Sequence, residues 1–157
     1  EIWQEKSVIL RTAWLYSEHG RNFAKTILKK ALSSVDEIEV VNDQFGQPTS
    51  SHDLACKIIE IVEADISSGI FHATNAGEAT WWEFAVEICK LGEIPGERVK
   101  PVSSDKFPSS VKRPSYSVLD HSMWASVGLA SMKDWRKALN EVFPSIRREV
   151  ERELQNV

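Results

Sequence analysis

The sequence predicts an α/β fold from three observations. Short apolar runs alternate with segments whose apolar residues recur at helical spacing, which is the pattern of strands joined by covering helices. A polar loop at residues 42–50, punctuated by Gly46 and Pro48, follows a β-like run and leads into a helical segment. The chain has 157 residues, enough for one domain with a real core. We therefore expect residues 1–157 to form a single α/β unit with fewer strands than a complete doubly wound sheet.

The first strand is expected at residues 8–10, an apolar run that continues through residues 12–14 like a parallel strand covered on both faces. Asn22 then stands where a helix N-cap is needed. The helix that it starts has an apolar side made of Phe23, Ile27, Leu28 and Ala31. The next strand is expected at residues 38–41.

The segment after the polar loop has the signals of a second helix. Ser51 or Asp53 can cap it, and its apolar positions recur at i, i+4, i+7 and i+8 as Leu54, Ile58, Ile61 and Val62. A Ser-Ser-Gly break at residues 67–69 ends this helix. Residues 70–73 then have the pattern of another strand.

A third helix is marked at its start by Thr80 and Glu83, which form a T-x-x-E capping box, and at its end by Gly92. Residues 93–120 contain prolines and few periodic apolar positions. They are therefore expected to be extended or looped, with one strand near residues 99–102.

The remaining chain is expected to be helical. A short helical turn starts at Ser122 and ends by Gly128, and Asp134 can cap a helix over residues 135–143. Pro144 is expected to interrupt that helix, because proline removes a backbone donor, and Ser145 to start a terminal one.

Composition and charge argue against several function classes. The net charge of −4 and the pI near 5.6 disfavour a nucleic-acid surface. No apolar run approaches the ~20 residues that span a bilayer, and the first residues lack the layout of a signal peptide, so no membrane partner and a cytoplasmic location are expected. Cys56 and Cys89 are expected to be buried reduced thiols, with a disulfide as the alternative.

Four segments carry a resemblance to a known family. They are N-D-Q-F-G-Q-P-T-S at residues 42–50, R-T-A-W-L-Y-S at 11–17, T-W-W-E-F-A at 80–85 and K-R-P-S-Y-S-V-L-D at 112–120. The chain closely resembles the dTDP-4-dehydrorhamnose reductases, extended short-chain dehydrogenases of nucleotide-sugar metabolism. The resemblance covers nearly the whole chain but only the carboxyl-terminal half of that family. It implies part of a Rossmann-type sheet together with a small α/β substrate-binding lobe.

The family's redox residues have no counterpart in this sequence. The seven glycines never form a G-x-G-x-x-G turn, and the positions four residues after Tyr16 and Tyr116 are Gly20 and Asp120, so the family's Tyr-x-x-x-Lys pair is absent. The chain also begins at Glu1 without a methionine. We therefore expect a carboxyl-terminal fragment with no catalytic residue of its own, whose amino-terminal dinucleotide-binding half is missing.

A carboxyl-terminal fragment would depend on the missing half for its cofactor and on a partner to cover its apolar surface. The resemblance implies NADPH, with NADH left open, in the full-length enzyme, and no cofactor bound tightly by this chain. An isolated half is expected to expose apolar sheet edges or helix faces, so that it either pairs with itself as a homodimer or packs loosely.

Three residues are candidates for binding a dTDP-sugar. By the resemblance, Trp14 contacts the sugar nucleotide; the alternative is a core aromatic. Arg113, held by the following proline, could grip a diphosphate through two N–H donors, or form only a surface salt bridge. Gln47 could border the pyrimidine base, although Gly46 and Pro48 around it also suit a purely structural turn.

The resemblance implies an activity, and two alternatives remain open beside it. The implied reaction is NADPH-dependent reduction of the C4 ketone of dTDP-4-dehydro-L-rhamnose to dTDP-L-rhamnose. One alternative is a non-catalytic regulatory subunit on the same fold, like that of methionine adenosyltransferase; the other is a different nucleotide-sugar reductase or epimerase. The four histidines show no metal-ligand spacing, and no G-x-S-x-G elbow supports a hydrolase.

Overall fold

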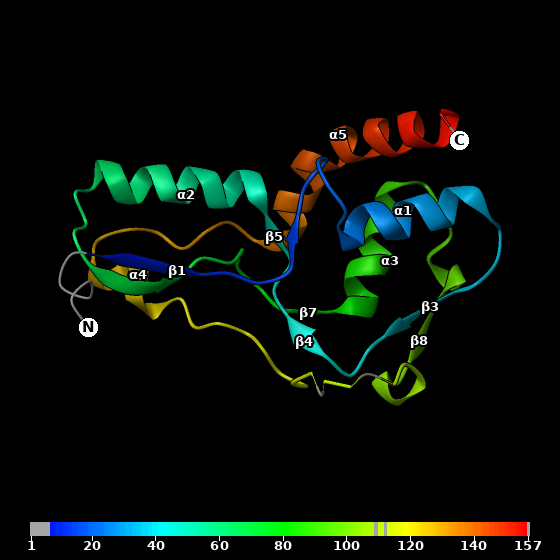
Figure 1. Ribbon diagram of the computed structural model, residues 1–157, viewed down its shortest axis with the longest axis horizontal. Helices are drawn as coiled ribbons and strands as arrows, with labels where there is room; N and C mark the ends of the chain where they lie inside the picture. The colour runs from blue at the N-terminus through cyan, green and yellow to red at the C-terminus, as the bar shows by residue number, and fades with distance from the viewer. Residues whose placement is uncertain (1–6, 109, 112, 157) are drawn as a thin grey trace.

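The computed structural model describes residues 7–108, 110–111 and 113–156. Its elements fall into two groups that lie at opposite ends of the molecule (Figure 1). One end holds β1, β6, α2 and α4, and the other holds α1, α3, β3, β8 and most of α5. Four short strands lie between the two ends. The α/β fold class expected from the sequence is confirmed.

The first group is built on one pair of parallel strands, β1 (Val8–Arg11) and β6 (Gly69–His72). The helices α2 (Ser51–Glu63) and α4 (Ser122–Ser126) accompany it, and its small core consists of Ile61, Phe71, Ala73, Trp124 and Met132. The expected extension of β1 through residues 12–14 is wrong. Trp14 has a positive φ of 47°, which an extended strand cannot accommodate, so the chain turns there.

The second group contains the larger core. The parallel strands β3 (Ile38–Val41) and β8 (Val99–Val102) pack with the helices α1 (Phe23–Ser33), α3 (Trp81–Leu91) and α5 (Trp135–Gln155). The largest fully buried side chains of this core are Tyr16, Leu28, Ile38, Phe84, Ile88, Trp135, Leu139, Ile146 and Val150. Burial of these apolar surfaces drives the three helices together.

The two groups are joined by short strand pairs. β2 (Leu15–Tyr16) lies parallel to β5 (Thr49–Ser50), and β4 (Phe45–Gly46) lies antiparallel to β7 (Ala79–Thr80). Both β4 and β5 belong to the segment expected from the sequence to be a polar loop. That segment is therefore a structured junction, and two 3₁₀ turns, Gly96–Arg98 and Ser104–Lys106, complete the element list of the described residues.

The helix caps expected for α1, α3 and α5 are confirmed. Asn22 accepts a hydrogen bond from the backbone N–H of Lys25, and Asp134 accepts one from Arg136. Thr80 and Glu83 form both bonds of the capping box. The cap expected for α2 is wrong, since its N-cap is Ser50, whose side chain forms no capping bond. The carboxylate of Asp53 does not cap the helix, because it accepts a hydrogen bond from Asn75 and pairs with Lys133.

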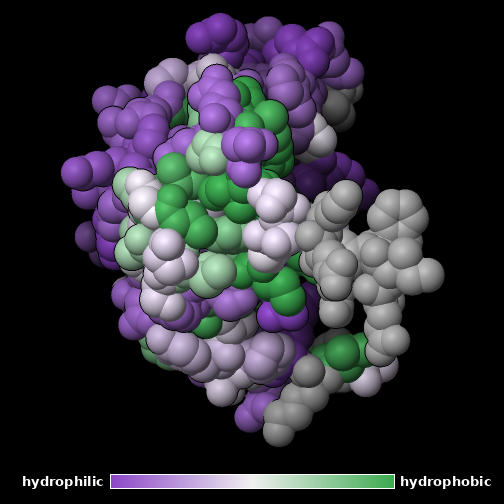
Figure 2. Space-filling view, turned by 90° about the vertical axis from the view of Figure 1, so that its left-hand side faces the viewer, coloured by the Kyte–Doolittle hydropathy of each residue, from purple (hydrophilic) through white to green (hydrophobic). Residues whose placement is uncertain are grey.

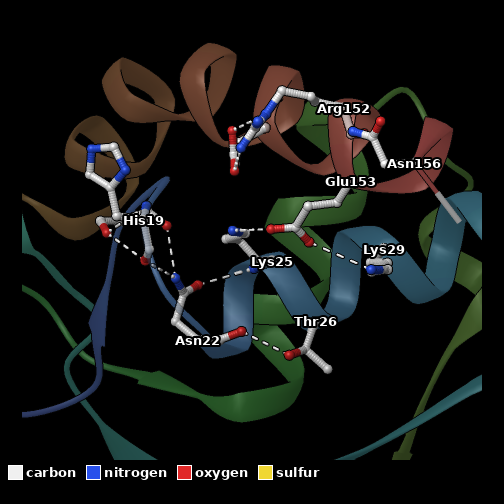
Figure 3. Close-up of polar contacts among 10 residues, drawn as sticks. His19, Asn22, Lys25, Thr26, Lys29, Arg152, Glu153 and Asn156 are labelled. Atoms are coloured by element: carbon white, nitrogen blue, oxygen red, sulfur yellow. Dashed lines mark hydrogen bonds and ion pairs between the residues drawn. The ribbon is translucent and has the colours of Figure 1, made fainter.

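Two ion pairs connect α1 to α5 (Figure 3). The ammonium of Lys25, nearly buried, lies 2.6 Å from one carboxylate oxygen of Glu153, and that of Lys29 lies 3.5 Å from the other. Asn22 and Thr26 lie on the same end of α1 and close its first turn. The pairs fix how the carboxyl-terminal half of α5 lies on α1.

The expected interruption at Pro144 is wrong, since α5 runs unbroken through it. A proline inside a helix removes one backbone hydrogen bond but leaves the remaining ones in place. Phe143 and Ile146 on either side of it are buried in the core. Tertiary packing thus outweighs the lost bond.

An apolar face of the first group is uncovered. Ile9 and Ile70, paired across β1 and β6, are exposed, as are Ile58, Ile59 and Val62 of α2. Figure 2 views this end of the molecule and shows apolar side chains gathered in its middle. Of the four recurring apolar positions of α2, only Ile61 is buried. This agrees with the expected exposure of apolar surface.

The cysteines differ in their environments. Cys89 is a buried free thiol, as expected, whereas Cys56 is exposed and the expectation that it is buried is wrong. Cys56 lies on α2, which covers the small core only with its Ile61 side. No helix of the described residues is long and apolar enough to cross a membrane.

Arg98 should be important for the stability of the larger group. Its guanidinium donates to the carbonyls of Ala31, Ser34 and Asp36, which closes the end of α1. Arg98→Ala leaves these carbonyls without their charged donor, and we expect a loss of about 1–3 kcal/mol in the free energy of unfolding. Urea denaturation measures it. Arg148→Ala, which removes an exposed arginine, is the control; an equal loss in both variants would contradict the role of Arg98.

Candidate functional site

Trp14 lies at the turn between β1 and β2, and its indole is held on the second group of elements. The ring stacks on Trp81 with 3.5 Å between centroids and 11° between planes. Gly46 lies so close to the ring that an added Cβ would overlap its atoms Cε2 and Cζ2. The backbone carbonyl of Trp14 accepts a hydrogen bond from the N–H of Thr49. Trp14 is therefore a fixed, partly exposed aromatic surface.

The indole N–H groups distinguish Trp14 and Trp81 from the other tryptophans. In the part of the chain that the structure describes, Trp82, Trp124 and Trp135 each donate to a backbone carbonyl. Trp14 and Trp81 have no such acceptor within that part. Their N–H donors are available to a ligand, as a polar handle on an apolar ring.

A cavity of about 1110 Å³ opens beside the end of β3. Its lining includes Gln44, Arg113 and three large apolar side chains that are exposed around it, Phe107, Val111 and Tyr116. Exposed aromatic rings next to a guanidinium suit a ligand with a flat base and an anionic group.

The floor of this cavity is held by Asp43. Its carboxylate accepts from the backbone N–H of Ser104 at 3.0 Å and from the hydroxyls of Ser103 and Ser104. The backbone bond from Ser104 is the main cause that keeps the pKa of Asp43 below its ordinary value. Asp43 therefore stays ionised and fixes the 3₁₀ turn at one side of the cavity.

Arg113 lies on the surface and lines the cavity. Within the described ranges it forms no ion pair, so the surface salt bridge that the sequence left open is not observed there. The role of Arg113 in binding stays a prediction.

Strand β4 connects the cavity with the Trp14 surface. Phe45 forms backbone bonds with Ser115 and Ser117 and bridges to Tyr116 at the cavity, and the next residue, Gly46, touches the indole of Trp14. The Tyr116 hydroxyl donates to Glu78 at 2.9 Å, which fixes the ring. Two candidate surfaces that are distant in sequence thus lie on one short strand.

Gln47 is almost completely buried, with 3% of its surface exposed. Its amide oxygen accepts from Thr74 Oγ1 at 2.9 Å and from the N–H of Leu119 at 2.8 Å, and its nitrogen donates to the carbonyl of Leu119. The side chain therefore ties the segment after Tyr116 to the end of β6. Contact between Gln47 and a substrate stays a prediction.

Hydrogen bonding determines which nitrogen of His121 carries a proton. The hydroxyl of Thr74 gives its only proton to Gln47, so it must accept from His121 Nε2, 2.7 Å away. Burial lowers the pKa of His121 below 6.5, and His72 adds to this while Asp120 opposes it. The neutral imidazole, protonated at Nε2, is the form that fits the folded chain.

Sequence reasoning missed Trp81 and Tyr116 as parts of the site. Both lie in segments that carried the family resemblance. A signal was present for Trp81, because two adjacent tryptophans at a helix start point in different directions and cannot share one environment. For Tyr116 the sequence holds no comparable signal, since its partner Glu78 is distant. The described residues contain no group of three or more side chains that could hold a metal ion.

Comparisons with known proteins show the family to which the chain belongs. The family of the RmlD substrate binding domain matches residues 3–148. The chain is 45% identical over 140 residues to a probable dTDP-4,6-dihydroxy-2-methyloxan-3-one 4-ketoreductase of Streptomyces antibioticus, covering 89% of this chain and 47% of that protein. It is 42% identical over 146 residues to a dTDP-4-keto-6-deoxy-D-glucose reductase of Streptomyces niveus, covering 92% and 49%.

A solved structure is similar as well. The dTDP-4-dehydrorhamnose reductase of Bacillus anthracis, in complex with NADP, superposes with a TM-score of 0.80 at 35% identity and covers 88% of this chain and 48% of that one. The chain thus spans about half the length of the relatives that it matches.

His121 should make the stability of the chain pH-dependent. The unfolded chain binds the proton with the ordinary pKa of 6.5 and the folded chain with a lower one. Stability is therefore full above about pH 6.5 and falls as the pH drops toward the folded value. Urea unfolding between about pH 5 and pH 8 measures this. His121→Gln keeps a donor for Thr74 without titrating, so its curve should be flatter; an unchanged curve would remove His121 as the cause.

Proposed function

The chain belongs to the family of the RmlD substrate binding domain, and we propose from this premise that it is the carboxyl-terminal portion of a dTDP-4-dehydrorhamnose reductase. The whole enzyme would reduce the C4 ketone of dTDP-4-dehydro-L-rhamnose to dTDP-L-rhamnose. The observation that carries the proposal is the family match over nearly the whole chain.

The names of the relatives support reduction as the reaction class. The three relatives reported above are named as ketoreductases or reductases of dTDP-linked sugars, but the sugar differs among them. They favour a reductase over a non-catalytic regulatory subunit or an epimerase. Dehydrorhamnose is the finer part of the proposal, and another dTDP-linked 4-ketosugar is the competing substrate.

In this proposal the chain supplies the surface that binds the sugar nucleotide. The partly exposed indole of Trp14 offers apolar surface and an N–H without an acceptor in the described residues, which suits a deoxysugar with a methyl group and hydroxyl groups. Arg113 would bind the diphosphate, and the aromatic cavity beside it would take the base. Gln47 would contribute by holding the segment that carries Tyr116 in place, in addition to any contact of its own.

We infer that the dinucleotide cofactor is held by the other half of the protein, because the glycines of this chain form no G-x-G-x-x-G turn. When bound by the whole enzyme, NADPH, or alternatively NADH, supplies hydride. The proton donor and the cofactor site would both belong to the other half of the protein.

The uncovered apolar face of β1, β6 and α2 supports a partner for this chain. The relatives are about twice as long, and we propose that their remaining half has a counterpart that covers Ile9, Ile70, Ile59 and Val62. Self-pairing into a homodimer is the competing occupant of the face. The cytoplasmic location expected from the sequence stays a prediction.

The assay that tests the proposed function compares this chain with the complete polypeptide. We expect the complete polypeptide to oxidise NADPH in the presence of dTDP-4-dehydro-L-rhamnose, and the 157-residue chain neither to turn over nor to bind NADPH tightly, because it lacks the redox residues. NADPH absorbance and calorimetry are the measurements. A panel of dTDP-linked 4-ketosugars identifies the substrate. Turnover by the 157-residue chain alone would contradict the proposal that the redox residues belong to the other half of the protein.

Trp14 should matter for the sugar more than for the fold. In the complete polypeptide, Trp14→Ala removes the apolar wall, and we expect KM for the dTDP-sugar to rise about tenfold, equivalent to about 1.4 kcal/mol, with the far-UV circular dichroism unchanged. Trp14→Phe keeps an aromatic ring and should recover part of the loss. Val35→Ala, at an 89% exposed position, is the control. Unchanged kinetics in Trp14→Ala would remove this residue from the site.

A further inference from the structure

We propose that Trp81 is a positioning residue that holds the Trp14 indole in the orientation that binds the sugar. The inference rests on the proposed function, because it assigns a role to Trp81 through Trp14. It goes beyond that function by naming what keeps the binding surface in place.

The Trp14 and Trp81 rings are in close contact. The two indoles are nearly parallel, with 11° between their planes and 3.5 Å between their centroids. Gly46 limits the ring as well, because no side chain fits between its backbone and the indole. Trp14 is therefore confined by two elements, the start of α3 and strand β4. A ring with these neighbours keeps a single orientation.

The backbone of Trp14 does not by itself define the orientation of the ring. Its φ of 47° lies in the left-handed region, which bulky residues seldom adopt unless their surroundings hold them there. The described contacts that hold it are the hydrogen bond from Thr49 to its carbonyl, the stack on Trp81 and the close approach of Gly46 to the ring. Removal of Trp81 takes away the aromatic surface under the ring and leaves only the hydrogen bond from Thr49 and the contact with Gly46.

Trp81 is itself held by the start of α3 and by α1. It is the first residue of α3, directly after Thr80, and the capping box of Thr80 and Glu83 closes that turn with a bond of 2.7 Å from the N–H of Thr80 to the Glu83 carboxylate. Phe23 of α1 packs on the Trp81 ring with 4.6 Å between centroids. The packing of α1 against α3 therefore fixes Trp81, and Trp81 in turn fixes the Trp14 ring.

A merely structural role for Trp81 is the alternative, and Trp82 offers a matched comparison. Both residues belong to the first turn of α3, are partly buried and pack against the same core. Trp82 donates its indole N–H to the carbonyl of Val99 and does not stack on Trp14. Loss of core packing should therefore be similar at the two positions, whereas loss of ligand binding should follow only from Trp81.

The experiment uses the complete polypeptide with Trp81→Leu, Trp81→Phe and Trp82→Leu. The probes are dTDP-L-rhamnose and dTDP, titrated by calorimetry, together with KM and kcat for the ketosugar. We expect Trp81→Leu to weaken dTDP-L-rhamnose binding and raise KM about tenfold, with dTDP binding and kcat changed less than about threefold. Trp81→Phe should restore most of the binding. Trp82→Leu should lose stability without changing the affinity ratio of the two probes.

A spectroscopic readout follows the stack without any ligand. Two stacked indoles couple their transitions, so the wild-type protein should show an exciton couplet in circular dichroism that Trp81→Leu and Trp14→Ala both abolish. Gly46→Ala, whose added Cβ would overlap the Trp14 ring and displace it, should weaken the couplet, whereas Gly96→Ala, where an added Cβ meets only ordinary contacts, should not.

The outcomes separate this inference from the proposed function. Normal dTDP-L-rhamnose affinity in Trp81→Leu with the couplet abolished would overturn the positioning role, and so would an equal effect of Trp82→Leu on the affinity ratio. Absence of turnover by the wild-type protein with every dTDP-ketosugar would reject the proposed function instead. In that case the binding titrations and the couplet still decide the role of Trp81.

Discussion

The stack of Trp14 on Trp81 is the contact on which the arrangement of the site depends. The backbone of Trp14 lies in the turn after β1, which belongs to the group around the small core, but its ring lies on α3, in the group around the larger core. A positive φ at Trp14 makes this crossing possible and carries a cost of about 1–3 kcal/mol that the surrounding contacts must offset. The two groups are thus coupled at Trp14, the residue that we propose contacts the substrate.

A second connection lies on the other side of the junction. Gln47, Thr74 and His121 form a buried chain of hydrogen bonds that holds the segment after Tyr116 against the end of β6. Because each member has a partner, this polar chain stabilises one arrangement rather than destabilising the interior. Gln47 directly follows β4, whose Phe45 bridges to Tyr116 at the cavity. The proposed sites for sugar and nucleotide are therefore held by connected parts of the junction.

The distribution of apolar surface separates the proposed binding surface from the face that a partner would cover. The larger core, built from α1, α3 and α5, is closed within the chain and carries Trp81 and its neighbours. The smaller core leaves one side of β1, β6 and α2 uncovered. The substrate-binding features depend on the closed core, and the open face is where the proposed other half would pack. Binding surface and partner surface are separate parts of one fold.

The sequence by itself determined the local structure. The caps at Asn22, Thr80 and Asp134 and the strands at residues 38–41 and 99–102 depend on neighbours a few residues away, and family motifs directed attention to Trp14 and Arg113. Tertiary structure alone decided the φ of Trp14, its partner Trp81, the continuous helix through Pro144, the exposure of Cys56 and the burial of Gln47. The reason is physical: these features follow from contacts between residues far apart in the chain, whose packing free energy outweighs local preference.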